Sequence, residues 1–128
     1  MRSYCDASVL ADLLLDPRSS GATRTMLQSW TDRGQVTTSR LTTVELGRLV
    51  LREGSSVRAT SLNVAALPIE YIALGDQVLR RAASLPIRFL KSLDAIHVAS
   101  ALLVEADVVL TRDRQMQRAC EELGLAVA

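Results

Sequence analysis

The sequence has few aromatic residues, few cysteines and almost no lysine. Aromatic side chains make up 3% of the 128 residues, so the hydrophobic core has to be built from leucine, valine, isoleucine and alanine. Two cysteines, Cys5 and Cys120, are too few for a disulfide framework, which indicates a reduced, cytoplasmic protein. Lys91 is the only lysine beside fourteen arginines. Arginine suits bidentate contact with phosphate, although a GC-rich genome gives the same bias without a nucleic-acid partner.

A long apolar run is also absent. No segment approaches the roughly 18 consecutive apolar residues that a membrane-spanning helix requires, and no secretory signal pattern is visible. The net charge of +1 neither predicts nor excludes binding to nucleic acid. With 48% hydrophobic and 23% charged residues, the composition is that of a globular protein, and the length suffices for one core. We therefore expect residues 1–128 to form a single domain that binds no membrane.

Strand and helix patterns alternate along the whole sequence. Predicted strands cover residues 2–5, 35–39, 68–74, 107–111 and 125–127. Predicted helices cover residues 7–15, 20–33, 41–52, 76–84, 92–105 and 114–123, with Asp16-Pro17 ending the first and Ser19 or Ser20 capping the second. A turn at residues 54–56 follows the third helix and leaves room for a short helix. The alternation predicts an α/β fold with a mainly parallel sheet covered on both faces, whose ligand site lies beyond the carboxyl ends of the strands.

Three aspartates stand at this predicted edge. Asp6 directly follows the first strand, Asp113 follows the strand at 107–111, and Asp94 lies in the first turn of a helix that Ser92 can cap. Each has an ordinary explanation, because aspartate caps helix N-termini and complements the helix dipole. Taken singly, none of the three indicates a site.

Glu45 lacks such an explanation. It lies four residues after Leu41 and four before Leu49, on the apolar stripe of its predicted helix. A carboxylate that faces a core is costly unless it is paired or bound to a cation, and one of the many arginines is an alternative partner. Asp94 meets the same difficulty on its own helix.

The four carboxylates together point to a metal site. If they converge, each pair at 4 Å repels by roughly 4 kcal/mol at an effective dielectric constant near 20. Divalent cations relieve that repulsion, and all-oxygen ligands favour Mg²⁺ or Mn²⁺ over zinc. The single histidine, His97, is interpreted as a packed or structural residue, one helical turn after Asp94.

Four short motifs give the sequence a family resemblance. They are Tyr-Cys-Asp-Ala-Ser-Val-Leu at 4–10, Thr-Val-Glu-Leu at 43–46, Leu-Asp-Ala-Ile-His-Val-Ala at 93–99 and Leu-Thr-Arg-Asp at 110–113. In this order and at this chain length they resemble the PIN domain, and more narrowly the VapC-like toxins of bacterial toxin–antitoxin pairs. One departure is Met116, which stands where an aromatic residue often follows the last aspartate.

The resemblance implies a three-layer α/β/α fold with a five-stranded sheet, and cleavage of RNA phosphodiester bonds that depends on Mg²⁺ or Mn²⁺. It also implies a homodimer and a small antitoxin partner. By motif, Asp6 and Asp94 are the principal metal ligands, while Glu45 and Asp113 complete the catalytic acidic pocket. Ser8 and Thr111 are implied as hydroxyl supports near the metal.

Basic residues beside the motifs are candidates to hold RNA phosphates. They are Arg88, Lys91, Arg112 and Arg114. Surface solubility explains them equally well. The choice of RNA is expected to depend on variable regions such as residues 53–67.

Other functions fit this sequence less well. A phosphoryl-aspartate phosphatase normally shows Asp-x-Asp after the first strand, where Ser8 holds the second place. A receiver domain needs a lysine closing a late strand, whereas Lys91 precedes a helix. An inactive PIN-like binding module and a housekeeping RNA-processing nuclease remain as alternatives to a toxin.

Overall fold

The fold is built on one parallel sheet of five short strands. The computed structural model describes residues 1–15, 20–54 and 66–128. The strands are β1 (Arg2–Cys5), β2 (Gln35–Ser39), β3 (Ile69–Ile72), β4 (Val108–Leu110) and β5 (Ala126–Val127). Their order is β3-β2-β1-β4-β5, and all four pairings are parallel. The predicted α/β class and parallel sheet are therefore confirmed, with β1 at the centre.

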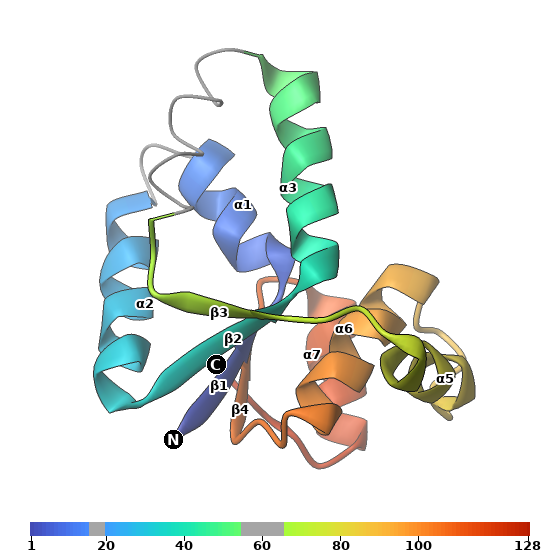
Figure 1. Ribbon diagram of the computed structural model, residues 1–128. Coiled ribbons are helices and arrows are strands. Elements are labelled where there is room, and N and C mark those ends of the chain that lie inside the picture. The colour runs from blue at the N-terminus through green and yellow to red at the C-terminus, as the bar shows by residue number, and fades with distance from the viewer. Residues whose placement is uncertain (16–19, 55–65) are drawn as a thin grey trace.

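Helices cover both faces of the sheet (Figure 1). They are α1 (Ala7–Leu15), α2 (Ser20–Arg33), α3 (Arg40–Glu53), α5 (Asp76–Ser84), α6 (Ser92–Leu103) and α7 (Arg114–Glu122). The first three lie on one side, and α6 and α7 lie on the other, with α5 packed against α6. This is a three-layer α/β/α arrangement. Among the described residues, no helix has the length and apolar character needed to cross a membrane.

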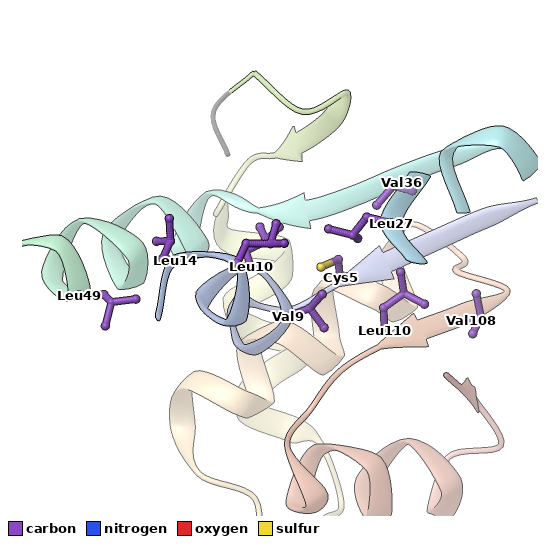
Figure 2. Packing of buried hydrophobic residues seen from close by; sticks show 10 residues of the cluster. Cys5, Val9, Leu10, Leu14, Leu27, Val36, Leu49, Val108 and Leu110 are labelled. Carbon is purple, nitrogen blue, oxygen red and sulfur yellow. The ribbon is translucent and has the colours of Figure 1, made fainter. Parts of the chain in front are cut away.

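The alternation of side chains along β1 supplies both cores. Cys5 points toward α1, where it packs with Val9, Leu10 and Leu110 in one buried cluster (Figure 2). Tyr4 points the opposite way, into a second cluster beneath α6 and α7. Successive residues of a strand face opposite sides of a sheet, so a strand covered on both faces needs apolar side chains at consecutive positions.

Most predicted element bounds hold within two residues. The helix of Asp94 ends at Leu103 rather than at residue 105, and β3 is four residues long where seven were predicted. The predicted cap Ser92 is wrong: Lys91 occupies the N-cap position, without a side-chain cap bond, and Ser92 is the first helical residue. The predicted break at 16–17, the cap at Ser19 and the short helix after residue 54 lie outside the described residues.

Gly34 is required where α2 meets β2. A β-carbon at this position would lie 1.9 Å from the backbone oxygen of Met1, and φ is +157°. The backbone of Gln35 donates a hydrogen bond to that same oxygen. A residue with a side chain at this position would force the start of β1 away from β2.

Candidate active site

A cleft of about 310 Å³ opens at the carboxyl edge of the sheet. All four carboxylates predicted from the sequence line it: Asp6, Glu45, Asp94 and Asp113. They come from four separate places in the chain, namely the end of β1, helix α3, the first turn of α6 and the segment after β4. The parallel sheet brings them together because each strand ends at this edge. Their catalytic role remains a prediction.

Asp6 is the most deeply buried of the four carboxylates, with 4% of its surface exposed. Its Oδ1 accepts hydrogen bonds from the Ser8 hydroxyl at 2.5 Å and the Ser8 backbone N–H at 3.0 Å. Its Oδ2 accepts a hydrogen bond from Thr111 Oγ1 at 2.5 Å. Burial raises the pKa of Asp6, while the bonds from Ser8 and Thr111 act in the opposite direction. Two hydroxyls thus fix both oxygens of this carboxylate.

Asp94 stands among like charges. Burial raises the pKa of this carboxyl group, and the charge of Asp113 raises it further, followed by smaller effects of Asp6 and Glu45. His97 acts in the opposite direction. Each neighbouring negative charge disfavours ionisation of Asp94 and so raises its pKa, as expected for carboxylates that share one pocket.

Asp113 both caps a helix and lines the cleft. Its Oδ1 accepts hydrogen bonds from the backbone N–H groups of Gln115 at 2.8 Å and Met116 at 3.2 Å. The ordinary capping explanation is therefore correct for this residue. The capping bonds engage only Oδ1, and Asp113 also lines the cleft.

Glu45 is held by His97, which the sequence analysis placed outside the site. His97 Nε2 lies 2.6 Å from Glu45 Oε1, and its Nδ1 lies 2.7 Å from the hydroxyl of Tyr4. The imidazole is buried, and it also lines the cleft. The sequence signal was the i, i+3 spacing from Asp94 to His97, which puts both on one helix face.

The cations predicted to bind RNA do not line this cleft. Arg88, Lys91, Arg112 and Arg114 are exposed. The guanidinium of Arg112 donates to Thr23 Oγ1 at 3.3 Å, and its backbone N–H donates to Ser8 Oγ at 2.9 Å. Among the residues that the structure describes, the cation that lines the cleft is Arg52, on α3. It lies seven residues after Glu45, which is close to two turns of helix and therefore the same face.

The chemistry of the donor set fits a hard divalent cation. Four carboxylates offer only oxygen ligands, as Mg²⁺ and Mn²⁺ prefer. Within residues 1–15, 20–54 and 66–128, no three Asp, Glu, His or Cys side chains are grouped so that they could hold one metal ion as they are placed.

Comparisons with known proteins show the family to which this chain is related. The family model described as "PIN domain" matches residues 3–122. The chain is 30% identical to Ribonuclease VapC47 of Mycobacterium tuberculosis (strain CDC 1551 / Oshkosh), over 98% of this chain and 94% of that protein. It is 31% identical to Ribonuclease VapC46 of M. tuberculosis (strain ATCC 25618 / H37Rv), over 97% and 94% of the respective chains.

Solved structures share the fold at lower identity. VapBC2 from Rickettsia felis, bound to a DNA fragment from its promoter, superposes with a TM-score of 0.77 at 13% identity, covering 100% of this chain and 98% of that one. VapC20 of M. tuberculosis, a toxin that cleaves the sarcin-ricin loop, superposes with a TM-score of 0.70 at 17% identity, covering 91% and 94%.

Proposed function

The chain belongs to the PIN domain family, and we propose that it is a metal-dependent endoribonuclease that acts as the toxin of a toxin–antitoxin pair. The observation that carries this proposal is the meeting of four carboxylates from four chain segments in one cleft. Two relatives that match nearly the full length are named ribonucleases. We propose that the substrate is RNA and that the protein acts in the cytoplasm.

Asp6 and Asp94 are the proposed principal ligands of Mg²⁺ or Mn²⁺, with Glu45 and Asp113 completing the set. A bound divalent ion would lower the pKa of a water molecule and offset charge on the phosphate oxygens. Ser8 and Thr111 keep the Asp6 carboxylate fixed, which holds it in one orientation as a metal ligand. The remaining carboxylates orient the attacking water in line with the phosphorus.

The proposed reaction is hydrolysis of the phosphodiester bond. The water oxygen forms a bond to phosphorus while the bond from phosphorus to the 3′ oxygen breaks. The 3′ oxygen leaves with a proton, so the products carry a 5′-phosphate and a 3′-hydroxyl. No histidine pair or lysine nucleophile is needed, consistent with a chain that has one of each residue.

Arg52 is the proposed phosphate contact within the cleft. Within the described part of the chain no carboxylate pairs with its guanidinium, whereas Arg112 is bonded to Thr23. Between Glu45 and Arg52 the cleft is lined by Leu46 and Leu49, which offer an apolar surface to a base or sugar. Arginine suits phosphate contact through its planar fork of donors.

A small antitoxin is the proposed protein partner. Leu15, Val44 and Leu51 are about half exposed or more, at 47%, 59% and 64%, on helices that border the cleft. We propose that an apolar helix of the antitoxin packs against these residues, and that a basic side chain from it enters the acidic cleft. A toxin–antitoxin complex from Klebsiella pneumoniae has this fold, as do VapBC2 from R. felis and VapBC-1 from nontypeable Haemophilus influenzae.

We further propose a homodimer. An apolar groove between α5 and α6 is lined by Leu79, Ala82, Ala95 and Ile96, and Leu93 is 50% exposed on α6. Burying this surface against a second copy would remove it from water, which is favourable by about 25 cal/mol per Å² of apolar area. Sedimentation of the purified chain tests this proposal directly.

The deciding experiment is cleavage of defined RNAs with and without Mg²⁺. Cleavage that stops in chelator and in Asp6→Asn supports the ribonuclease. Full cleavage in chelator contradicts the mechanism. No cleavage by folded, Mg²⁺-supplied protein favours an inactive binding module. Toxicity of the chain expressed alone, relieved by a co-expressed neighbouring small reading frame, distinguishes a toxin from a housekeeping nuclease.

A further inference from the structure

A buried hydrogen-bond chain leads from the core of the protein to the cleft. It runs from the Tyr4 hydroxyl through the imidazole of His97 to the carboxylate of Glu45, over 2.7 Å and 2.6 Å. Tyr4 is 0% exposed and His97 is 2% exposed, whereas the Glu45 side chain is 27% exposed. Exposure therefore increases along the hydrogen-bond chain, from Tyr4 in the core to Glu45 at the cleft.

The chemistry of the partners determines which nitrogen of His97 carries the proton. An ionised carboxylate can only accept hydrogen bonds, so Nε2 must donate to Glu45. The Tyr4 hydroxyl, which can donate or accept a hydrogen bond, lies 2.7 Å from Nδ1 and holds the ring at its second nitrogen. Burial strongly raises the pKa of Tyr4, so this hydroxyl keeps its proton.

We propose that His97 is a positioning residue that fixes the orientation of Glu45, and that the Tyr4 hydroxyl holds the imidazole ring in place for this. The inference rests on the proposed ribonuclease function. The Glu45 side chain is long and 27% exposed, so without a partner it would have several rotamers to choose from. Because His97 holds Oε1, rotation of the carboxylate is restricted. Oε2 therefore presents a single orientation to the cleft. Partners of this kind typically change metal affinity or activity by about 10- to 100-fold.

Kinetics of matched variants test the positioning role. His97→Leu removes the donor, whereas His97→Gln places an amide N–H where Nε2–H stood. We expect His97→Leu to lower kcat by about 10- to 100-fold with little change in KM for RNA, and His97→Gln to recover most of it. Tyr4→Phe keeps the ring and removes only the hydroxyl, and should give a smaller loss of kcat.

A double-mutant cycle separates positioning from general loss of structure. If His97 acts only through Glu45, His97→Leu lowers kcat no further in a Glu45→Gln background. Equal losses in both backgrounds, measured on protein with a native unfolding transition, would overturn the proposal. If His97→Leu does not fold, the same cycle with Glu45→Gln is measured for His97→Gln and for Tyr4→Phe.

The proton on Nε2 gives a readout that does not depend on activity. His97 is the only histidine, so the imidazole nitrogen signals in an NMR spectrum of the chain belong to one residue. We expect Nε2 to carry a proton in the wild type, and this proton to exchange faster with water in Tyr4→Phe. A ring protonated on Nδ1 alone would overturn the chain of bonds. This result stands whether or not the protein cleaves RNA.

Discussion

Thr111 Oγ1 donates a hydrogen bond to Asp6 Oδ2 over 2.5 Å, which joins the ends of the two central strands β4 and β1. Thr111 is 2% exposed, so the bond is shielded from water. It sets the orientation of the most buried carboxylate in the cleft. The same hydroxyl accepts a hydrogen bond from the Asp113 N–H at 3.1 Å, so Thr111 links two of the four acidic residues.

Removing that hydroxyl should impair activity more than folding. Thr111→Val keeps the shape of the side chain, and we expect activity to fall by about 10- to 100-fold. The free energy of unfolding should fall by about 1–3 kcal/mol, because a buried acceptor loses its partner. Cleavage rates and urea unfolding measure the two effects. Thr111→Ser, which keeps the donor, is the control, and wild-type activity in Thr111→Val would contradict the role.

Asp6→Asn should abolish cleavage while the protein stays folded. The amide retains size and part of the hydrogen bonding, and it removes one of four like charges. In metal-free protein we expect the melting temperature to stay the same or rise, since repulsion falls. Circular dichroism melts in chelator and an RNA cleavage assay test this pair of outcomes. A large drop in melting temperature would show that the charge of Asp6 stabilises the fold instead.

The free energy of unfolding should depend on pH through the carboxyl group of Asp94. Its pKa in the folded protein lies above the ordinary value of 3.8. The folded state therefore holds this proton more tightly than the unfolded state, and the stabilisation present at low pH is lost as pH rises through the folded pKa. Asp94→Asn should be more stable than the wild type at pH 7 without metal, and the gap should close as the pH approaches 4. A gap that widens on acidification would contradict the raised pKa.

Arg52→Gln should weaken RNA binding without changing the chemistry. We expect KM to rise with kcat nearly unchanged, and the slope of log affinity against log salt to fall by about 1, as for one lost phosphate contact. Arg81→Gln, on α5 and away from the cleft lining, is the matched control. An equal effect of both substitutions would indicate only a general loss of positive charge.

Ser3 offers a substitution that should stabilise the protein. Within the described residues, its hydroxyl is the one buried side-chain polar atom without a hydrogen-bond partner. Ser3→Ala removes that unsatisfied group, and the free energy of unfolding should rise by about 1 kcal/mol. Thr37→Val is a useful contrast, because Thr37 Oγ1 donates to the Ser3 carbonyl oxygen at 3.0 Å and its loss should destabilise. Chemical denaturation of both variants measures whether the free energy of unfolding rises for Ser3→Ala and falls for Thr37→Val.

The sequence predicts the sheet and the positions of the acidic residues well because both depend on local patterns. A strand directly before Asp6, or an apolar stripe through Glu45, can be read from neighbouring residues. The capping role of Asp113 is local in the same way, since it involves residues two and three positions ahead.

The hydrogen-bond partners of His97 and the place of Arg52 in the cleft could not be predicted, because both depend on contacts between segments that are distant in sequence. Tyr4 and His97 are 93 residues apart in sequence, and His97 and Glu45 are 52 apart. Arg52 looks like any solvated arginine near a helix end until α3 is placed along the cleft. The RNA contact predicted for Arg112 remains a prediction; the structure adds that its guanidinium donates to Thr23 on α2.

The short last strand has a practical consequence for anyone handling this protein. Beyond β5, the backbone N–H of Ala128 donates to the Val109 carbonyl, and the Ala128 carbonyl accepts from Thr111 N–H at 3.4 Å. A purification tag fused after Ala128 would therefore emerge beside the residue that supports Asp6. A polyhistidine tag there would compete for the divalent ions under study and add imidazole signals to the spectrum of His97. Met1 directly precedes β1, at the opposite edge of the sheet, so a cleavable tag belongs there.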